Sequence, residues 1–190
     1  MAYTLEQFCQ DARQAMKADP DPGDGGREKT RDLLAKLLKE KAFVDKYCSP
    51  DAKPGTVQLY RDPELDFVVL AHCFKGGAKS PPHDHGTSWA IYGQAVGHTN
   101  VEVWRRKDGA KGDRQEGHAE LEKIDQYELN EGDAGVFHPG IVHTVEFTPG
   151  SRYIRVTGTD LGKLLQGVYD LDKHTVAPGN PAAHINARAM

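Results

Sequence analysis

Long hydrophobic runs and paired cysteines are both missing from this sequence of 190 residues. No apolar run approaches the roughly 20 residues that a membrane-spanning helix needs, and the N-terminus lacks the basic and apolar regions of a secretion signal. The three cysteines, Cys9, Cys48 and Cys73, are an odd number without a close pair, so neither a disulfide framework nor a thiolate zinc site is expected. We therefore expect a cytoplasmic protein that does not enter a membrane.

An excess of positive charge is also lacking. The 24 lysines and arginines against 28 aspartates and glutamates give a formal net charge of −4, so there is no basic surface for phosphates and nucleic acid is not an expected partner. What is present is the composition of a soluble globular domain, with 38% hydrophobic and 27% charged residues. A chain of this length is expected to form one domain.

The first quarter of the chain has the periodicity of helices. Thr4 and Gln7 resemble a capping box, and apolar residues follow them at helical spacing. Prolines and glycines interrupt the pattern over 18–26, and a second apolar stripe runs through 27–47. We expect two helices, the second bent near its end, in a helical segment of residues 1–50 that packs on the rest of the domain.

From about residue 55 the pattern changes to that of strands. Six short segments rich in β-branched and aromatic residues are separated by Gly, Pro and Asp turns: 56–61, 66–74, 99–106, 123–130, 143–148 and 152–158. Successive short strands predict a β-sandwich or barrel rather than a parallel α/β sheet. We expect a mainly β domain at 51–170 and an irregular tail at 171–190.

Two histidines one residue apart, His83 and His85, follow a pair of prolines that excludes a helix. In an extended segment, side chains at i and i+2 point to the same face. The two imidazoles would then converge on a divalent metal ion, while Asp84 faces away. Taken alone, an HxH pair on a solvent-exposed face is the simpler interpretation.

The spacing around these histidines resembles that of the cupin superfamily. Gly77 precedes the pair by six residues and Gly97 closes the segment, as in the first cupin motif. The segment 132–143 is similar to the second motif, although its Pro-Gly turn is one residue tighter than the common pattern. The resemblance implies a double-stranded β-helix, or jelly-roll barrel, with the two helices at its N-terminus and with His83, His85 and His143 as metal ligands.

A carboxylate ligand is missing from this pattern. Most cupins carry a glutamate five residues after the second histidine, where this chain has Ala90. Three neutral histidines leave the metal its full positive charge, with open positions for an anionic substrate and for dioxygen. We expect Fe(II), although the same ligands suit Zn, Ni and Mn.

Within the cupins, the two helices, the segment DFVVLAHCF and the sequence HDHGTSWA resemble the cysteine dioxygenase and 3-mercaptopropionate dioxygenase family, with one residue inserted before Trp89. The resemblance implies conversion of a small thiol to a sulfinate with Fe(II) and O2. It places Arg61 near a position that binds the substrate carboxylate, although an exposed arginine at a strand end would explain this residue equally well. We expect Trp89 to form a hydrophobic wall of the substrate site.

The last predicted strand departs from that family. Where the family has Ser, His and Tyr at alternating positions, this chain has Tyr153, Arg155 and Thr157, which share one face of a strand. If that face points into the barrel, Arg155 lies beside the metal and favours a more anionic substrate than cysteine. If the opposite face points inward, the three residues lie on the surface. We favour the first arrangement, with Arg155 as substrate-binding and catalytic residue and with Tyr92 and Tyr153 as further catalytic candidates.

The expected function is that of an iron-dependent dioxygenase acting on a small anionic thiol and O2. Two alternatives remain. One is a cupin metalloenzyme of other chemistry, such as a lyase, an isomerase or a carbon–carbon-cleaving oxygenase of a small carboxylate, because one fold supports many reactions. The other is a ligand-sensing cupin without turnover. The sequence leaves the oligomeric state open.

Overall fold

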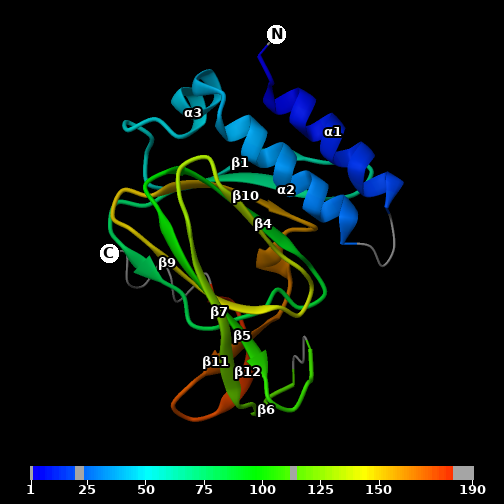
Figure 1. Ribbon diagram of the computed structural model, residues 1–190, viewed down its shortest axis with the longest axis vertical. Coiled ribbons are helices and arrows are strands. Elements are labelled where there is room, and N and C mark those ends of the chain that lie inside the picture. The colour runs from blue at the N-terminus through cyan, green and yellow to red at the C-terminus, as the bar shows by residue number, and fades with distance from the viewer. Residues whose placement is uncertain (1, 20–23, 112–114, 182–190) are drawn as a thin grey trace.

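Antiparallel sheets and a layer of helices make up the fold, in a computed structural model that describes residues 2–19, 24–111 and 115–181 (Figure 1). The first sheet has the strand order β1 (Gly55–Arg61), β2 (Val68–Cys73), β10 (Arg152–Thr157), β4 (Ala90–Val96) and β8 (Ala134–Phe137). The second has the order β3 (Ala78–Lys79), β9 (Val142–Phe147), β5 (Thr99–Arg106) and β7 (Leu121–Leu129). A smaller third sheet has the order β11 (Gln166–Asp170), β12 (Thr175–Gly179) and β6 (Gly117–His118).

The chain crosses between the two large sheets at almost every connection. Strands β2, β4, β8 and β10 lie in the first sheet, and β3, β5, β7 and β9 lie in the second. The neighbouring strands of both sheets pair antiparallel. Strand β1 is an additional edge strand of the first sheet. The other strands form two four-stranded layers in the orders 2-10-4-8 and 3-9-5-7, which is the arrangement of a jelly roll, the double-stranded β-helix. The predicted mainly β fold is confirmed.

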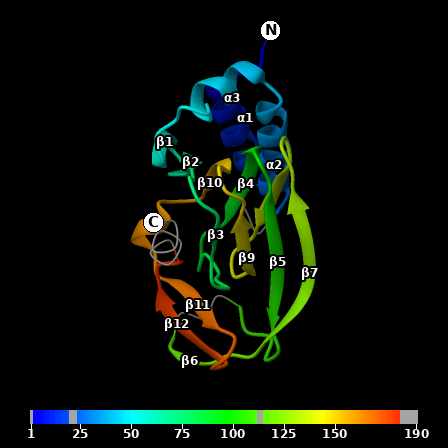
Figure 2. The same cartoon turned by 90° about the vertical axis from the view of Figure 1, so that its left-hand side faces the viewer.

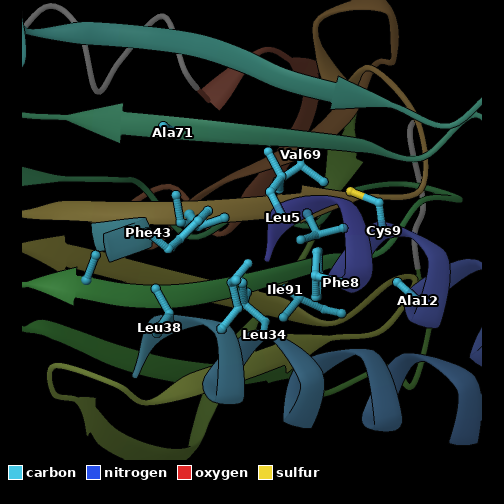
Figure 3. Close-up of a cluster of buried hydrophobic side chains, with 14 of the residues drawn as sticks. Leu5, Phe8, Cys9, Ala12, Leu34, Leu38, Phe43, Val69, Ala71 and Ile91 are labelled. Atoms are coloured by element: carbon cyan, nitrogen blue, oxygen red, sulfur yellow. The ribbon is translucent and has the colours of Figure 1, made fainter. Parts of the chain in front are cut away.

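Helices α1 (Leu5–Ala18), α2 (Gly25–Leu38) and α3 (Lys41–Tyr47) cover the outer face of the first sheet (Figure 1). Figure 3 shows the side chains of α1 and α2 packed between the helices and the strands, in a buried cluster that includes Phe8, Leu34, Val69 and Ile91. Figure 2 shows the third sheet at the opposite end of the molecule. The helices therefore cover the outer face of the first sheet, and the buried hydrophobic cluster inside the jelly roll consists of strand side chains.

The helical segment differs from the sequence prediction at one point. The Thr4 hydroxyl accepts the Gln7 backbone N–H at 3.2 Å and caps α1, as the capping box predicts. The segment 27–47, however, forms two helices and not one bent helix. The chain becomes extended at Glu40, with ψ at 101°, and the Glu40 carboxylate accepts the Tyr3 backbone N–H at 3.1 Å. The break therefore ties the start of the chain to the helical layer.

The predicted irregular tail contains a strand. Residues 175–179 form β12, which pairs with β11 along its whole length. Proline and glycine residues in this part of the sequence obscured the strand pattern, because they are depleted from strands in general. Residues 182–190 of the predicted tail lie outside the described part of the chain. None of the three helices has the length and apolar character to span a membrane.

Candidate metal centre

The segment that carries His83 and His85 runs between β9 and β11 as an extended chain. His83 and His143 exchange two backbone hydrogen bonds, N–H to O=C at 3.0 Å and at 2.9 Å in the reverse direction. On the other side, the Tyr169 N–H donates to the Pro82 carbonyl at 2.9 Å. Directly opposed residues of an antiparallel pair have neighbouring side chains. The pairing therefore brings together histidines that lie far apart in the sequence.

The three histidines form a cluster that could hold a metal ion. One ring nitrogen from each of His83, His85 and His143 lies within 4.8 Å of the others, and the side chains are 2%, 1% and 0% exposed. A buried polar atom without a partner is costly, yet His143 Nε2 and His85 Nδ1 have no hydrogen-bond partner among the described residues. These orphaned nitrogens fit a bound metal ion, which would satisfy them.

Backbone carbonyl groups orient two of the rings. The Nδ1 atom of His83 lies 2.9 Å from the Pro81 carbonyl oxygen, and that of His143 lies 3.2 Å from the Ile141 carbonyl oxygen. A carbonyl can only accept, so each Nδ1 carries the proton and leaves the Nε2 lone pair free to bind a metal. Metal-binding histidines are commonly held in this way.

Burial keeps the cluster neutral. Desolvation lowers the pKa of His83 to about 4, helped by the nearby Arg155 charge. The pKa values of His85 and His143 lie well below the ordinary value of 6.5 for the same first cause. All three imidazoles are therefore unprotonated at neutral pH, which is the form that a metal ion binds.

A cavity of about 220 Å³ adjoins the cluster. His83 and His85 form part of its wall, and Tyr92, Tyr153 and Arg155 form another part. The rest of the lining comes from four further parts of the chain: Thr56 on β1, Leu70 on β2, Val145 and Phe147 on β9, and Asp160, Leu161, Gly162, Gln166, Asn180 and Pro181 in the C-terminal region. The volume suits a small molecule.

Strand β10 points Tyr153 and Arg155 into the barrel. Arg155 pairs with Leu70 on one side and with Tyr92 on the other, and all three line the cavity. The alternate residues of β10, Ile154 and Val156, are fully buried against the helices. Of the two arrangements considered for this strand, the structure has the one in which Arg155 faces the histidines. Its Nε atom is buried without a hydrogen-bond partner in the described structure.

Two tyrosines stand beside Arg155. The Tyr92 hydroxyl lies 3.4 Å from His85 Nε2, and the ring of Tyr153 is stacked between Phe147 and His72, with centroids 4.6 Å apart in each case. Burial raises the pKa of both phenols, although the Arg155 charge opposes it. Both hydroxyls therefore stay protonated at neutral pH and can donate hydrogen bonds.

Comparison with known proteins gives distant structural likenesses. No family model and no curated protein matches the chain. KdgF from Halomonas sp. is 23% identical over 56% of this chain and 81% of its own, with a TM-score of 0.40. The Schizosaccharomyces pombe Cnp3 cupin domain is 10% identical over 58% of this chain and 66% of its own, with a TM-score of 0.42. With identities below 25% and TM-scores below 0.5, neither likeness decides the family of this chain.

A further similar structure is hydroquinone 1,2-dioxygenase PnpCD, solved with Cd2+ and 4-hydroxybenzonitrile. It is 17% identical over 65% of this chain and 74% of its own, with a TM-score of 0.43. Likenesses of this degree carry no conclusion about the function of this chain. What each of these proteins binds or converts is a property of that protein.

Two predicted substrate-binding residues lie outside the cavity. Arg61 is exposed at the end of β1, where its guanidinium pairs with Asp66 at 2.6 Å. Trp89 is buried under the helices, on the outer face of the first sheet, because its neighbour Ala90 takes the inward position. Neither residue lines the cavity beside the histidines, and their roles in substrate binding stay predictions.

Several cavity-lining or supporting residues were missed by the sequence analysis. Asp84, which was expected only to face away from the metal, is fully buried. His72 is buried with its Nδ1 atom 2.9 Å from the Thr56 hydroxyl, and desolvation lowers its pKa well below 6.5. The C-terminal segment contributes Gln166 and Asn180 to the wall. Of these residues, only His72 could have been found from the sequence, because it lies two positions after Leu70 on one strand and therefore shares its face.

Proposed function

We propose that this protein is an iron-dependent cupin dioxygenase that oxidises a small anionic thiol to its sulfinate with O2. The observation that carries the proposal is the pairing of a neutral three-histidine cluster with a half-buried cation, Arg155, at one cavity. The histidines would hold Fe(II) without a carboxylate to neutralise it. A metal ion of full charge beside a guanidinium favours a substrate with at least two negative groups.

The residues of the chain have distinct roles in this reaction. Bound Fe(II) supplies the redox chemistry by which both atoms of O2 join the substrate sulfur. Arg155 would bind the substrate carboxylate and fix the distance of its sulfur from the histidines, because a guanidinium holds a carboxylate through two parallel hydrogen bonds. The protonated hydroxyls of Tyr92 and Tyr153 would donate to the oxygen atoms that develop negative charge.

The overall reaction balances without a further reductant. A thiolate and one O2 give one sulfinate: two sulfur–oxygen bonds form, the oxygen–oxygen bond breaks, and the four electrons that reduce O2 come from the sulfur. The burial of the three histidines excludes bulk water from the reacting atoms. No residue of the chain needs to change its oxidation state.

Oxygen uptake tests the proposal directly. The protein is loaded with Fe(II) under anaerobic conditions and mixed with cysteine, 3-mercaptopropionate, cysteamine or mercaptosuccinate. We expect uptake with a thiol that carries a carboxylate, one O2 for each sulfinate formed, and the strongest discrimination against cysteamine, which has no carboxylate for Arg155.

The control is His143→Ala, which removes one ring nitrogen from the cluster and should abolish uptake. Metal analysis of each preparation accompanies the assay. If iron-loaded protein consumed no oxygen with any of these thiols, the thiol dioxygenase proposal would be rejected.

A further inference from the structure

Asp84, the residue between the two histidines of the HxH pair, is a fully buried carboxylate. Its Oδ1 atom accepts the backbone N–H of Gly86 at 2.6 Å and that of Gly167 at 3.2 Å, and its Oδ2 atom accepts the Tyr169 hydroxyl at 3.0 Å. A buried charge is stable only when it is well hydrogen-bonded. Asp84 is therefore committed to three donors and is not available as a metal ligand.

The three donors join two separate parts of the chain. The Gly86 bond closes a local turn directly after His85, at a position where the glycine has a φ of 60°. The other two donors belong to β11, from the C-terminal hairpin. The Asp84 N–H also donates to the Gly167 carbonyl at 3.0 Å. The HxH segment is thus fastened to β11 by both the backbone and the side chain of Asp84.

A cation extends the arrangement toward the third sheet. The Arg106 guanidinium interacts with the Tyr169 hydroxyl and with Asp108, which it meets at 2.6 Å. Tyr169 is itself buried, so its ring and hydroxyl have little freedom. Asp84 is consequently held by a chain of polar groups that begins on β5 and passes through β11.

We propose that Asp84 is a positioning residue of the metal centre: its carboxylate fixes the backbone on which His83 and His85 stand, and Tyr169 of the C-terminal hairpin holds that carboxylate. The inference rests on the metal-binding part of the proposed function and is independent of the substrate. Because a metal ion needs ligand atoms at fixed distances and angles, loosening this support should weaken binding without removing a ligand.

Two variants and one matched control test the inference. Asp84→Asn leaves the size unchanged but offers one acceptor oxygen in place of two, and Tyr169→Phe removes a single donor. Tyr3→Phe is the control, because the Tyr3 hydroxyl also donates to a carboxylate, Asp11, at 2.8 Å, but in the helical layer. The probe is Co(II) alone, with affinity measured by competition with a coloured chelator and geometry by the visible absorption spectrum.

We expect Asp84→Asn to bind Co(II) about 10- to 100-fold more weakly than the wild type, and Tyr169→Phe about tenfold more weakly. The absorption bands should shift in both variants, which a purely structural role of Asp84 would not produce. Tyr3→Phe should bind Co(II) with wild-type affinity and spectrum. Urea unfolding of each metal-free variant shows whether it is folded before the titration.

Three results would overturn the inference. Folded Asp84→Asn and Tyr169→Phe with wild-type affinity and spectrum would show that the histidines need no such support. Equal losses in Tyr169→Phe and Tyr3→Phe would attribute the effect to general destabilisation. A wild-type protein that binds no Co(II) would remove the metal centre itself. By contrast, a wild type that binds Co(II) and oxidises no thiol would reject the proposed reaction and leave the role of Asp84 intact.

Discussion

Single residues set the charge of the cavity. Desolvation keeps the buried histidines neutral, while Arg155 brings a guanidinium into the same space. The Arg155 side chain is half-buried, and its Nε atom is buried without a hydrogen-bond partner within the described residues, which is unfavourable. An anionic ligand would supply both the charge and the acceptor that this side chain lacks.

Replacement of Arg155 by methionine should therefore affect substrate binding most. We expect the KM for a thiol carboxylate to rise by about 10- to 100-fold, because a hydrogen bond to a charged group contributes about 1.5–3 kcal/mol. Steady-state oxygen uptake measures the change. Arg61→Met, which removes an exposed guanidinium outside the cavity, is the control and should leave KM unchanged. An unaltered KM in Arg155→Met would remove this residue from the substrate site.

At the level of elements, the strands with a clear pattern could be predicted and those without one could not. Strand β5 follows its predicted bounds, since an alternating pattern marks a sheet with one covered face. Strand β4 is buried on both faces, at six of its seven positions, so its sequence has no alternation. The direction of Trp89 could not be predicted either. The sequence does not tell which face of the sheet the helices cover, so it does not tell whether this side chain points toward the helices or into the barrel.

The local features of the site could be predicted from the sequence, and those that depend on distant strands could not. The HxH spacing requires only an extended backbone, which the prolines favour, so the convergence of two histidines follows from local sequence. The surroundings of Asp84 depend on β11, a strand more than 80 residues later. No local pattern carries that information. Likewise, the inward direction of Arg155 depends on which face of β10 the helices cover.

The contact between α2 and β4 gives a test at this scale. Gly93 lies where a Cβ atom would come within 2.6 Å of Leu38 Cδ1 and 2.9 Å of Leu34 Cγ. We expect Gly93→Ala to lower the free energy of unfolding by about 1–3 kcal/mol, because the side chains of Leu34 and Leu38 must shift to make room for the added methyl group. Urea unfolding measures it. Gly117→Ala, where a Cβ atom would meet nothing within 4 Å, should have little effect, and equal losses in both would contradict this packing.

The molecule as a whole buries several histidines in the neutral state, and this makes its stability depend on pH. In the folded chain the pKa of His83 is about 4, and those of His72, His85 and His143 lie well below 6.5. Below pH 6.5 the unfolded chain binds protons that the folded chain does not bind. The stability that these neutral histidines contribute is therefore fully present above pH 6.5 and decreases as the pH falls toward about 4.

Metal-free protein should accordingly unfold at a lower urea concentration at pH 5 than at pH 7. Each buried histidine contributes about 1.4 kcal/mol per pH unit within that window. His72→Phe keeps a ring stacked on Tyr153 but removes one titrating group. It should therefore reduce the dependence of the unfolding free energy on pH by about 1.4 kcal/mol per pH unit. Gly93→Ala is the control: it is destabilised at the helix contact, has all of the histidines, and should show the same dependence of stability on pH as the wild type. A stability that did not change between pH 7 and pH 5 would contradict the burial of neutral histidines.

The mutual hydrogen bonds of His83 and His143 also determine when the centre can be completed during synthesis of the protein. The first two ligands leave the ribosome 58 residues before the third, and Tyr169, which fastens Asp84, follows 26 residues later still. Until β9 and β11 have paired, the early histidines have no fixed partner across the barrel. Under the proposed function, metal would therefore be loaded late in the maturation of this chain, after most of the jelly roll has formed.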